Sequence, residues 1–455
     1  MDPKSFMEAN SKQRLMELFE FLRFPSVSAK SEHKKDVLAC AEWLAAHMEK
    51  MGVETQIIPT RGHPVVFGNK ITSPDKLTVL YYGHYDVQPP EPLELWKTSP
   101  FEPTVEGEYM IARGATDDKG QLFTHIKAIE AFLGTGAELP INVKLFIEGE
   151  EESGSENTER FINENKQLLK ADLAVISDTA QFARNKPAVT YGLRGVAFVE
   201  VKVIGPNRDL HSGSFGGAVP NPINILAKIV ASLHDKNGRV TIPGFYKDVH
   251  PITAWEKKQI KRLPFSQKEF LAKVGTKGLC GEKGYSSLER IWSRPTLDCN
   301  GITGGYQGEG GKTIIPSWAS CKITMRLVPN QNPVDVINRI DKYIRTICPK
   351  YVILEITKHG GTPGVVVPTD GPWLAAAGAA IKRGFGLEPV FIKEGGSIPV
   401  VGTFKRVLGL DTLLLGWGQN DDNAHSPNER FSVKDFERGC YSSLALIEEL
   451  AKARK

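Results

Sequence analysis

Residues 77–90 read LTVLYYGHYDVQPP, an apolar run that ends in a histidine and an aspartate and is followed by two prolines. An apolar run without polar alternation predicts a strand that is buried on both faces, and the prolines predict its end. Three later stretches have the same character: Ile141–Ile147, Leu173–Ile176 and Thr412–Leu415. Helical patterns separate the first three runs, and such strand–helix–strand units predict a parallel sheet.

A different strand pattern begins after Leu193. Residues 196–204 and 321–328 alternate apolar and polar side chains, which indicates antiparallel strands with one solvated face. Helical segments are expected near 222–235 and 333–347, and doubly buried strands return only near 390 and 412. We therefore predict an α/β protein in which a main domain, with a largely parallel central sheet flanked by helices, carries an inserted α+β domain. The predicted boundaries are 1–193 and 367–455 for the main domain and 194–366 for the inserted domain.

The composition is that of an ordinary soluble protein. A chain of 455 residues is too long for one compact core, and a net charge of +4 gives no support for binding to nucleic acid or membranes. The six cysteines are scattered, which fits reduced thiols better than a zinc ribbon or a disulfide framework. The polar N-terminus lacks a secretory signal, and no apolar run approaches the roughly 18 residues of a membrane span. We expect a cytoplasmic protein.

Polar groups that can bind metals follow each doubly buried run. In a parallel sheet these ends meet at one edge, where functional groups collect. Carboxylates gathered there repel one another unless cations lie between them. Counting also the stretch that begins at Met110, the groups that follow the strands are His84 and Asp86; Asp117 and Asp118; Glu148, Glu150, Glu151 and Glu152; Asp178; and His425.

This set of side chains contains two imidazoles and several carboxylates but no thiolate. It suits Zn²⁺ or Mn²⁺, and the number of carboxylates indicates two ions. Two ions about 3.5–4 Å apart can share a carboxylate and a water, polarise a carbonyl and supply hydroxide at neutral pH. The alternative is a set of unrelated surface loops without a common site.

Six motifs then occur in order along the chain: GHYDVQP, ARGATDDKGQ, EGEEESGSE, ISD, DLHSG and AHSPNE. They resemble the M20 family of di-metal peptidases, and within it the cytosolic dipeptidase, or carnosinase-like, branch. The resemblance extends over nearly the whole chain. It implies that the main domain is catalytic and that the inserted domain is a lid that also forms a homodimer.

The resemblance also implies a role for each matched residue. His84 would bind one divalent metal ion and His425 the other, and Asp117 would bridge both. Glu152 and Asp178 would each supply one further metal ligand.

Two further acids would support the chemistry by the same resemblance. Asp86 would hydrogen-bond the far nitrogen of His84 and so fix its tautomer. Glu151 would be the general base, taking a proton from the bridging water and later passing one to the leaving amine. The run of glutamates leaves the register open; anchoring on E-S-G-S makes Glu152 the ligand and Glu151 the base. Glu150 departs from this branch, which often has an apolar residue there.

The resemblance also implies roles for residues of the inserted domain and of the segment that follows it. In the family, the histidine of DLHSG reaches the active site of the neighbouring subunit and stabilises an oxyanion, so His211 is expected to act in trans. Thr313 and Arg326 would lie where the substrate carboxylate is held, and arginine suits that task through its planar fork. Ser397 would lie near the same carboxylate, and Glu394 near the substrate amine.

One stretch resembles a phosphate-binding loop only superficially. In GGYQGEGGKT (304–313) the glycine that the G-x-x-x-x-G-K-[ST] pattern requires falls on Tyr306, and an extended Ile-Ile-Pro follows instead of a helix. A nucleotide site is therefore not expected. Six histidines outside the motifs are expected to be ordinary surface or packed residues: His33, His63, His125, His234, His250 and His359.

The expected activity is metal-dependent hydrolysis of dipeptides. The alternatives are an N-acyl-amino-acid deacylase or a metallocarboxypeptidase with the same metal site, and, in another class, a peptide-binding or scaffolding protein without metals. Closure of the lid is expected to complete the site before the chemical step.

Overall fold

The computed structural model describes residues 1–396 and 398–453. The chain divides into two compact units. Unit 1 consists of Met1–Tyr191, Val367–Ile392 and the chain from Thr403 on, and unit 2 consists of Gly192–Val366 and Lys393–Gly402. The predicted boundaries assign all of 367–455 to the main domain, whereas Lys393–Gly402 belongs to unit 2. The strand pattern of the sequence contains no signal for this return.

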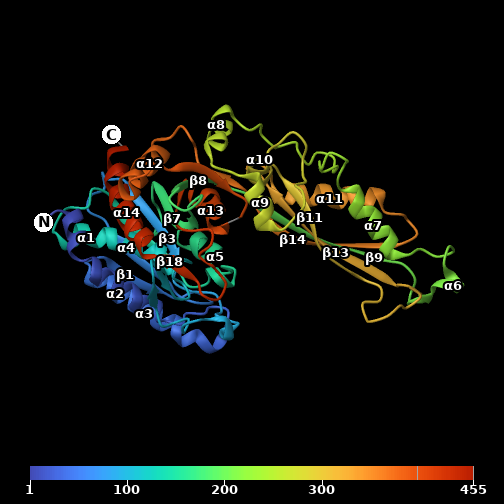
Figure 1. Cartoon of the computed structure of the whole chain (residues 1–455), viewed down its shortest axis with the longest axis horizontal. Coiled ribbons are helices and arrows are strands. Elements are labelled where there is room, and N and C mark those ends of the chain that lie inside the picture. The colour runs from blue at the N-terminus through green and yellow to red at the C-terminus, as the bar shows by residue number, and fades with distance from the viewer. Residues whose placement is uncertain (397, 454–455) are drawn as a thin grey trace. The chain divides into compact units, whose positions relative to one another are not determined.

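Unit 1 is built on a mixed sheet that is flanked by helices (Figure 1). The centre of this sheet is parallel. Its four central strands are the four apolar runs of the sequence. β15 (Val365–Val366) and β16 (Val390–Glu394) pair with β8. The order of strands across the sheet is β1 (Glu54–Ile58), β2 (Val65–Lys70), β6 (Asn142–Glu148), β3 (Thr78–His84), β7 (Leu173–Ala180), β17 (Thr412–Gly418) and β8 (Ala188–Leu193).

Both faces of this sheet are covered. On β3, Tyr81 packs against His125 of a helix with ring centroids 4.9 Å apart, whereas Tyr82 packs against Phe404 at 5.7 Å. Successive residues of a strand point to opposite faces, so this pair explains why the run contains no polar alternation. The helical elements of unit 1 are α1 (Pro3–Ala9), α2 (Ser11–Leu22), η1 (Ser31–His33), α3 (Lys34–Lys50), η2 (Leu93–Leu95), α4 (Lys119–Gly134), η3 (Glu151–Ser153), α5 (Thr158–Glu164), α12 (Pro372–Phe385), η4 (Phe404–Leu408) and α14 (Val433–Ala453).

Unit 1 also contains a small second sheet. It consists of β4 (Thr104–Glu106), β5 (Tyr109–Ile111) and β18 (Arg430–Ser432). The loop from β5 turns tightly into α4 at Gly120, where an added Cβ would lie 1.9 Å from the Ala115 carbonyl oxygen. Only glycine allows that approach, and the loop that it closes contains Asp117.

Unit 2 contains a four-stranded antiparallel sheet with its own core. The strands run in the order β11 (Thr296–Gly304), β13 (Trp318–Leu327), β9 (Gly195–Ile204) and β14 (Ile353–Thr362). Buried and more exposed residues alternate along β9, as the sequence predicts. A two-stranded ribbon is formed by β10 (Leu210–His211) and β12 (Ile314–Ile315).

Two amphipathic helices of unit 2 begin with the same local signal. In α7 (Pro222–Ser232) and α11 (Pro333–Ile347), the preceding asparagine accepts hydrogen bonds from the backbone of the first turn, and proline occupies the first position. Their apolar sides pack with the sheet in one hydrophobic core. The remaining helices are α6 (Ser212–Phe215), α8 (Ala254–Arg262), α9 (Gln267–Val274), α10 (Ser287–Ser293) and α13 (Pro399–Thr403), whose last residue belongs to unit 1. Within the described residues, no helix is long and apolar enough to cross a membrane.

Candidate metal centre

His84 is the last residue of β3, and its side chain is completely buried. Its Nδ1 atom lies 3.1 Å from the Asp86 carbonyl oxygen and 3.4 Å from Asp86 Oδ1. The same Asp86 carboxylate accepts hydrogen bonds from the backbone N–H groups of Glu151 and Glu152, at 3.2 and 3.1 Å. Asp86 therefore joins the end of β3 to the turn after β6. The opposite nitrogen of His84, Nε2, is buried and makes no hydrogen bond.

Asp117 lies between the two histidines that the sequence singles out. Its Oδ1 atom is 3.3 Å from His84 Nε2, and its Oδ2 atom is 2.9 Å from His425 Nε2. The expectation that Asp117 follows a strand of the main sheet is wrong, because β5 pairs with β4 and β18. Asp117 instead reaches the cluster from the loop between β5 and α4.

Two groups of three potential ligands meet at Asp117. His84, Asp117 and Asp178 can place one ligand atom each within 4.8 Å of one another, and so can Asp117, Glu152 and His425. Asp178 lies on β7, while Glu152 lies in η3 with its Oε2 atom 3.2 Å from His425 Nε2. The structure thus brings all five predicted ligands together around one shared carboxylate.

The electrostatics of this cluster favour added positive charge. Burial, followed by the charges of Asp117 and Asp118, raises the pKa of Asp178 well above its ordinary value. Burial also raises the pKa of Asp118, whose Oδ1 atom is buried without a hydrogen-bond partner. Around Asp117, burial opposes ionisation, but the neighbouring imidazoles of His425 and His84 outweigh it and lower the pKa. Oxygen and imidazole donors that share excess negative charge fit divalent ions such as Zn²⁺ and Mn²⁺.

The three successive glutamates have different surroundings. Glu150 accepts two hydrogen bonds from Asn157 Nδ2, at 3.0 and 3.1 Å. Glu152 faces His425, as described above. Burial and then the charges of Glu152 and Asp117 raise the pKa of Glu151 to about 7, against the opposing charge of His84. A carboxylate with that pKa can exchange protons near neutral pH, which supports Glu151 as the base.

Three residues that contact the cluster were not assigned roles from the sequence. Gln88 donates from Nε2 to Glu152 Oε2 at 2.8 Å. Asp118 accepts from the His84 backbone N–H at 3.3 Å. Glu429 contacts the loop of Asp117. The motifs contain all three, but their sequence positions do not reveal which groups they contact.

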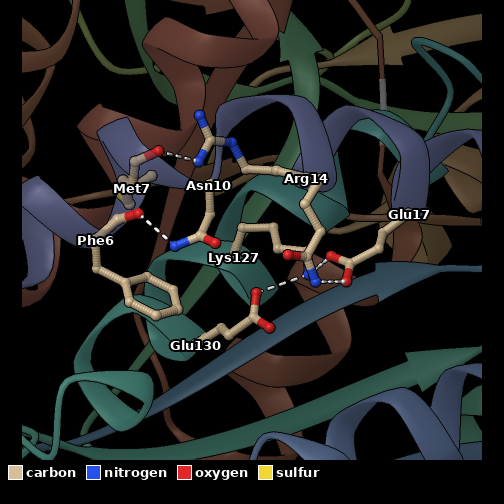
Figure 2. Close-up of a pocket in the computed structure, with 8 residues that line it drawn as sticks. Phe6, Met7, Asn10, Arg14, Glu17, Lys127 and Glu130 are labelled. Carbon is tan, nitrogen blue, oxygen red and sulfur yellow. Dashed lines mark hydrogen bonds and ion pairs between the residues drawn. The ribbon is translucent and has the colours of Figure 1, made fainter.

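A third cluster of potential ligands lies away from this centre, beside a small pocket lined by residues of α1, α2 and α4 (Figure 2). It contains Glu17, His47 and Glu130. The buried Lys127 ammonium contacts all three, with Nζ 2.7 Å from Glu130 Oε2, 3.0 Å from His47 Nε2 and in an ion pair with Glu17. Lys127 thus supplies the positive charge that a metal would otherwise provide, and His47 is a packed residue that stacks on Trp43.

In unit 2, His211 is the last residue of β10, and Thr313 directly precedes β12, the other strand of the ribbon. His211 Nδ1 accepts from the backbone N–H groups of Gly213 and Ser214, at 3.1 and 3.2 Å. In the neutral ring the proton therefore lies on Nε2. The Ser212 backbone N–H donates to the Thr313 carbonyl oxygen at 3.0 Å, so the two predicted residues belong to one local structure.

Arg326 lies elsewhere in unit 2. It pairs with Val196 at the start of β9, whereas the stretch that contains Thr313 leads into the other end of β13 at Trp318. Arg326 is the eighth residue after Trp318 along the strand, about 26 Å away at 3.3 Å per residue. The stretch with Thr313 and the residue Arg326 are therefore connected to opposite ends of β13.

Glu394 and an unpredicted arginine lie at the Arg326 end. The Arg194 backbone N–H donates to the Glu394 carbonyl oxygen at 3.3 Å. Burial and then the charge of Arg326 lower the pKa of Arg194 to about 10. Ser397 lies outside the described residues. In the sequence, Arg194 could have been noticed as an arginine directly after an apolar strand, in GLRG. That position does not indicate which group the arginine contacts.

Comparisons with known proteins agree on one family. The model of peptidase family M20/M25/M40 matches residues 80–449. The chain is 35% identical to the Cys-Gly metallodipeptidase dug1 of Schizosaccharomyces pombe, over 94% of this chain and 93% of that protein. It is 32% identical to the human Beta-Ala-His dipeptidase, over 86% of this chain and 78% of that protein. The crystal structure of the M20 family metallo-carboxypeptidase Sso-CP2 from Sulfolobus solfataricus superposes with a TM-score of 0.84 and 35% identity, covering 96% of this chain and 99% of that one.

Proposed function

Because the chain belongs to peptidase family M20/M25/M40 and is a peptide hydrolase, we propose that it is a metallodipeptidase that uses two divalent ions, Zn²⁺ or Mn²⁺. The observation that carries this proposal is the position of Asp117, which is shared by two groups of three ligands. His84, Asp117 and Asp178 would hold one ion, and Asp117, Glu152 and His425 the other. Dipeptidase names among the similar proteins support the substrate class.

The bound ions would polarise the scissile carbonyl and lower the pKa of the attacking water. The protein's own groups move the protons. Glu151, whose pKa is raised to about 7 by burial first of all, takes a proton from the attacking water and passes one to the leaving amine. Asp86 holds His84 in the tautomer that leaves Nε2 free for a metal.

We propose that His211 stabilises the oxyanion of a partner subunit in a homodimer formed through unit 2. Its Nδ1 accepts two backbone hydrogen bonds, so Nε2–H remains available as a donor. Its ribbon and Arg326 lie at opposite ends of β9 and β13, which supports contributions from two chains to one site. Thr313 would then act with His211 from the partner, and Arg326 from the chain's own side.

The substrate is a short peptide with both termini free. Arg326 and Ser397 would hold its carboxylate, the former through a bidentate contact. Glu394 would recognise its amine. An N-acyl-amino-acid deacylase or a metallocarboxypeptidase would share the metal centre but would not need the amine. A location in the cytoplasm stays a prediction.

A panel of substrates tests this assignment. The protein, loaded with Mn²⁺ or with Zn²⁺, is given free dipeptides, the same dipeptides N-acetylated, N-acyl amino acids and tripeptides, and release of amino acids is followed. We expect cleavage of free dipeptides only. Faster cleavage of N-acylated substrates or of longer peptides would replace the dipeptidase assignment by one of the two alternatives.

A further inference from the structure

Glu429 has an unusual set of partners for a side chain that is completely buried. Its Oε2 atom accepts hydrogen bonds from Arg113 Nη1 at 2.7 Å and from the Gly114 backbone N–H at 3.0 Å. Its Oε1 atom accepts from the backbone N–H groups of Thr116 and Asp117, at 2.9 and 3.1 Å. One carboxylate therefore satisfies three backbone donors of a single loop, including that of Asp117 itself.

Glu429 also belongs to the loop that contains His425. His425 and Asn428 have positive φ values of 62° and 60°, a conformation that costs non-glycine residues about 1 kcal/mol each. Such a conformation persists only where its surroundings hold it. The Ala112 backbone N–H donates to the Glu429 carbonyl oxygen at 3.1 Å, so side chain and backbone of one residue both join this loop to that of Asp117.

A second contact joins the same two loops. Thr116 Oγ1 donates to Asp422 Oδ2 at 3.2 Å, and the Gln419 backbone N–H donates to the same oxygen at 2.6 Å. Asp422, however, contacts only the hydroxyl of Thr116 in the loop of Asp117. Glu429 contacts its backbone, which determines where the Asp117 side chain begins.

We propose that Glu429 is a positioning residue that sets the separation of Asp117 and His425 and so the geometry of the metal pair. The inference rests on the proposed role of Asp117 as the shared ligand. Glu429 does not itself face the ligand atoms; it acts through the Asp117 backbone on one side and through the strained loop of His425 on the other. Arg113 neutralises its charge, so it orders the loops without adding a free carboxylate to the cluster.

The test is the affinity of metal-free protein for Mn²⁺, measured by calorimetry for wild type and for Glu429→Gln. The amide keeps the shape but turns a donor toward groups that are donors themselves. We expect Mn²⁺ affinity to fall about 10- to 100-fold, as for other groups that orient metal ligands. We also expect the electron paramagnetic resonance spectrum to lose the signature of two coupled Mn²⁺ ions.

Glu282→Gln in unit 2 is the matched control. Glu282 is also a buried carboxylate paired with an arginine, through bonds of 2.7 and 2.9 Å to Arg294, so its loss should destabilise the fold without changing Mn²⁺ affinity. If Glu429→Gln does not fold, the double variant Arg113→Gln, Glu429→Gln removes both charges and leaves neither unpaired. Unchanged affinity and coupling in the folded variant would overturn the inference. Failure of wild type to bind two ions would overturn the metal assignment of the proposed function instead.

Discussion

At the scale of single residues, neighbouring glutamates with different contacts provide the sharpest test of the mechanism. Replacing Glu151 with Gln removes the proton acceptor but keeps its size. We expect the turnover rate to fall at least about 100-fold, the lower end of what a general base contributes, while both metals stay bound. Metal content and kcat measured on the same sample check this.

Glu150→Gln is the matched control for that variant. Its carboxylate is occupied by Asn157, so the rate should stay near that of wild type. Loss of activity in Glu150→Gln together with full activity in Glu151→Gln would move the base by one residue.

His125 is the residue whose protonation is most clearly opposed by the fold. It lies in the core against Tyr81, with Nε2 2.7 Å from Ser177 Oγ, and burial lowers its pKa from the ordinary 6.5 to about 3. Between about pH 6.5 and pH 3, therefore, this histidine is protonated in the unfolded chain but neutral in the folded protein. Stability from this residue is complete above about pH 6.5 and falls as the pH drops toward 3, by at most about 1.4 kcal/mol per pH unit.

Replacing His125 with Phe should reduce the slope of the unfolding free energy against pH. Between pH 6 and 4 the reduction should correspond to about one proton bound on unfolding. Denaturant unfolding at several pH values, with a chelator present so that metal loss does not contribute, measures this slope. His359→Gln, at a side chain that is 51% exposed, is the control variant that also has one histidine fewer. Equal slopes in wild type and His125→Phe would show that His125 is not held neutral.

At the scale of elements, parallel strands explain why distant residues share one site. β3, β6 and β7 end side by side, which brings His84 and Asp178 together with the turn after β6. Asp86 then joins two of these strand ends through its bonds to the backbone of Glu151 and Glu152. Its removal should therefore disturb a metal ligand and the proposed base at once.

Asp86→Asn tests this connection. The amide cannot accept both backbone bonds, and its contact with His84 loses its charge. We expect metal affinity to fall about 10- to 100-fold and the rate to fall further at saturating metal, because Glu151 is displaced as well. Retention of both metals during dialysis, and kcat at saturating metal, are the measurements. Recovery of the full rate by excess metal alone would mean that Asp86 does not position the base.

The strands and their ends also show which parts of the fold and of the site the sequence alone predicts. The apolar runs predict the four central strands. The positions of His84 and Asp178 can be predicted as well, because the end of an apolar run is visible in the local sequence. Asp117 was expected at such an end as well, but it lies in a loop beside a separate sheet. The contact of Glu429 with Asp117 spans 312 residues of sequence. Such contacts depend on how two loops pack, and no local pattern encodes that.

At the scale of the whole molecule, the proposed dimer makes a prediction about mixed subunits. His211→Ala should lower kcat more than metal content, because His211 belongs to unit 2, whereas the proposed ligands belong to unit 1. Mixing His211→Ala chains with Glu151→Gln chains under conditions that exchange subunits creates dimers in which one site combines an intact base and an intact histidine. Random exchange should restore about a quarter of the wild-type rate. No recovery, with exchange shown by differently tagged chains, would exclude action in trans.

The proposal that two bound ions are needed for hydrolysis is tested most directly by measuring metal binding and catalysis together. Metal-free protein is titrated with Mn²⁺, and in parallel with Zn²⁺, while bound ions per chain and hydrolysis of a free dipeptide are measured on the same samples. We expect a negligible rate without metal and a rate that rises to its maximum as the second ion binds. Full hydrolysis by metal-free protein, or a maximum at one ion per chain, would contradict a centre in which Asp117 serves two ions.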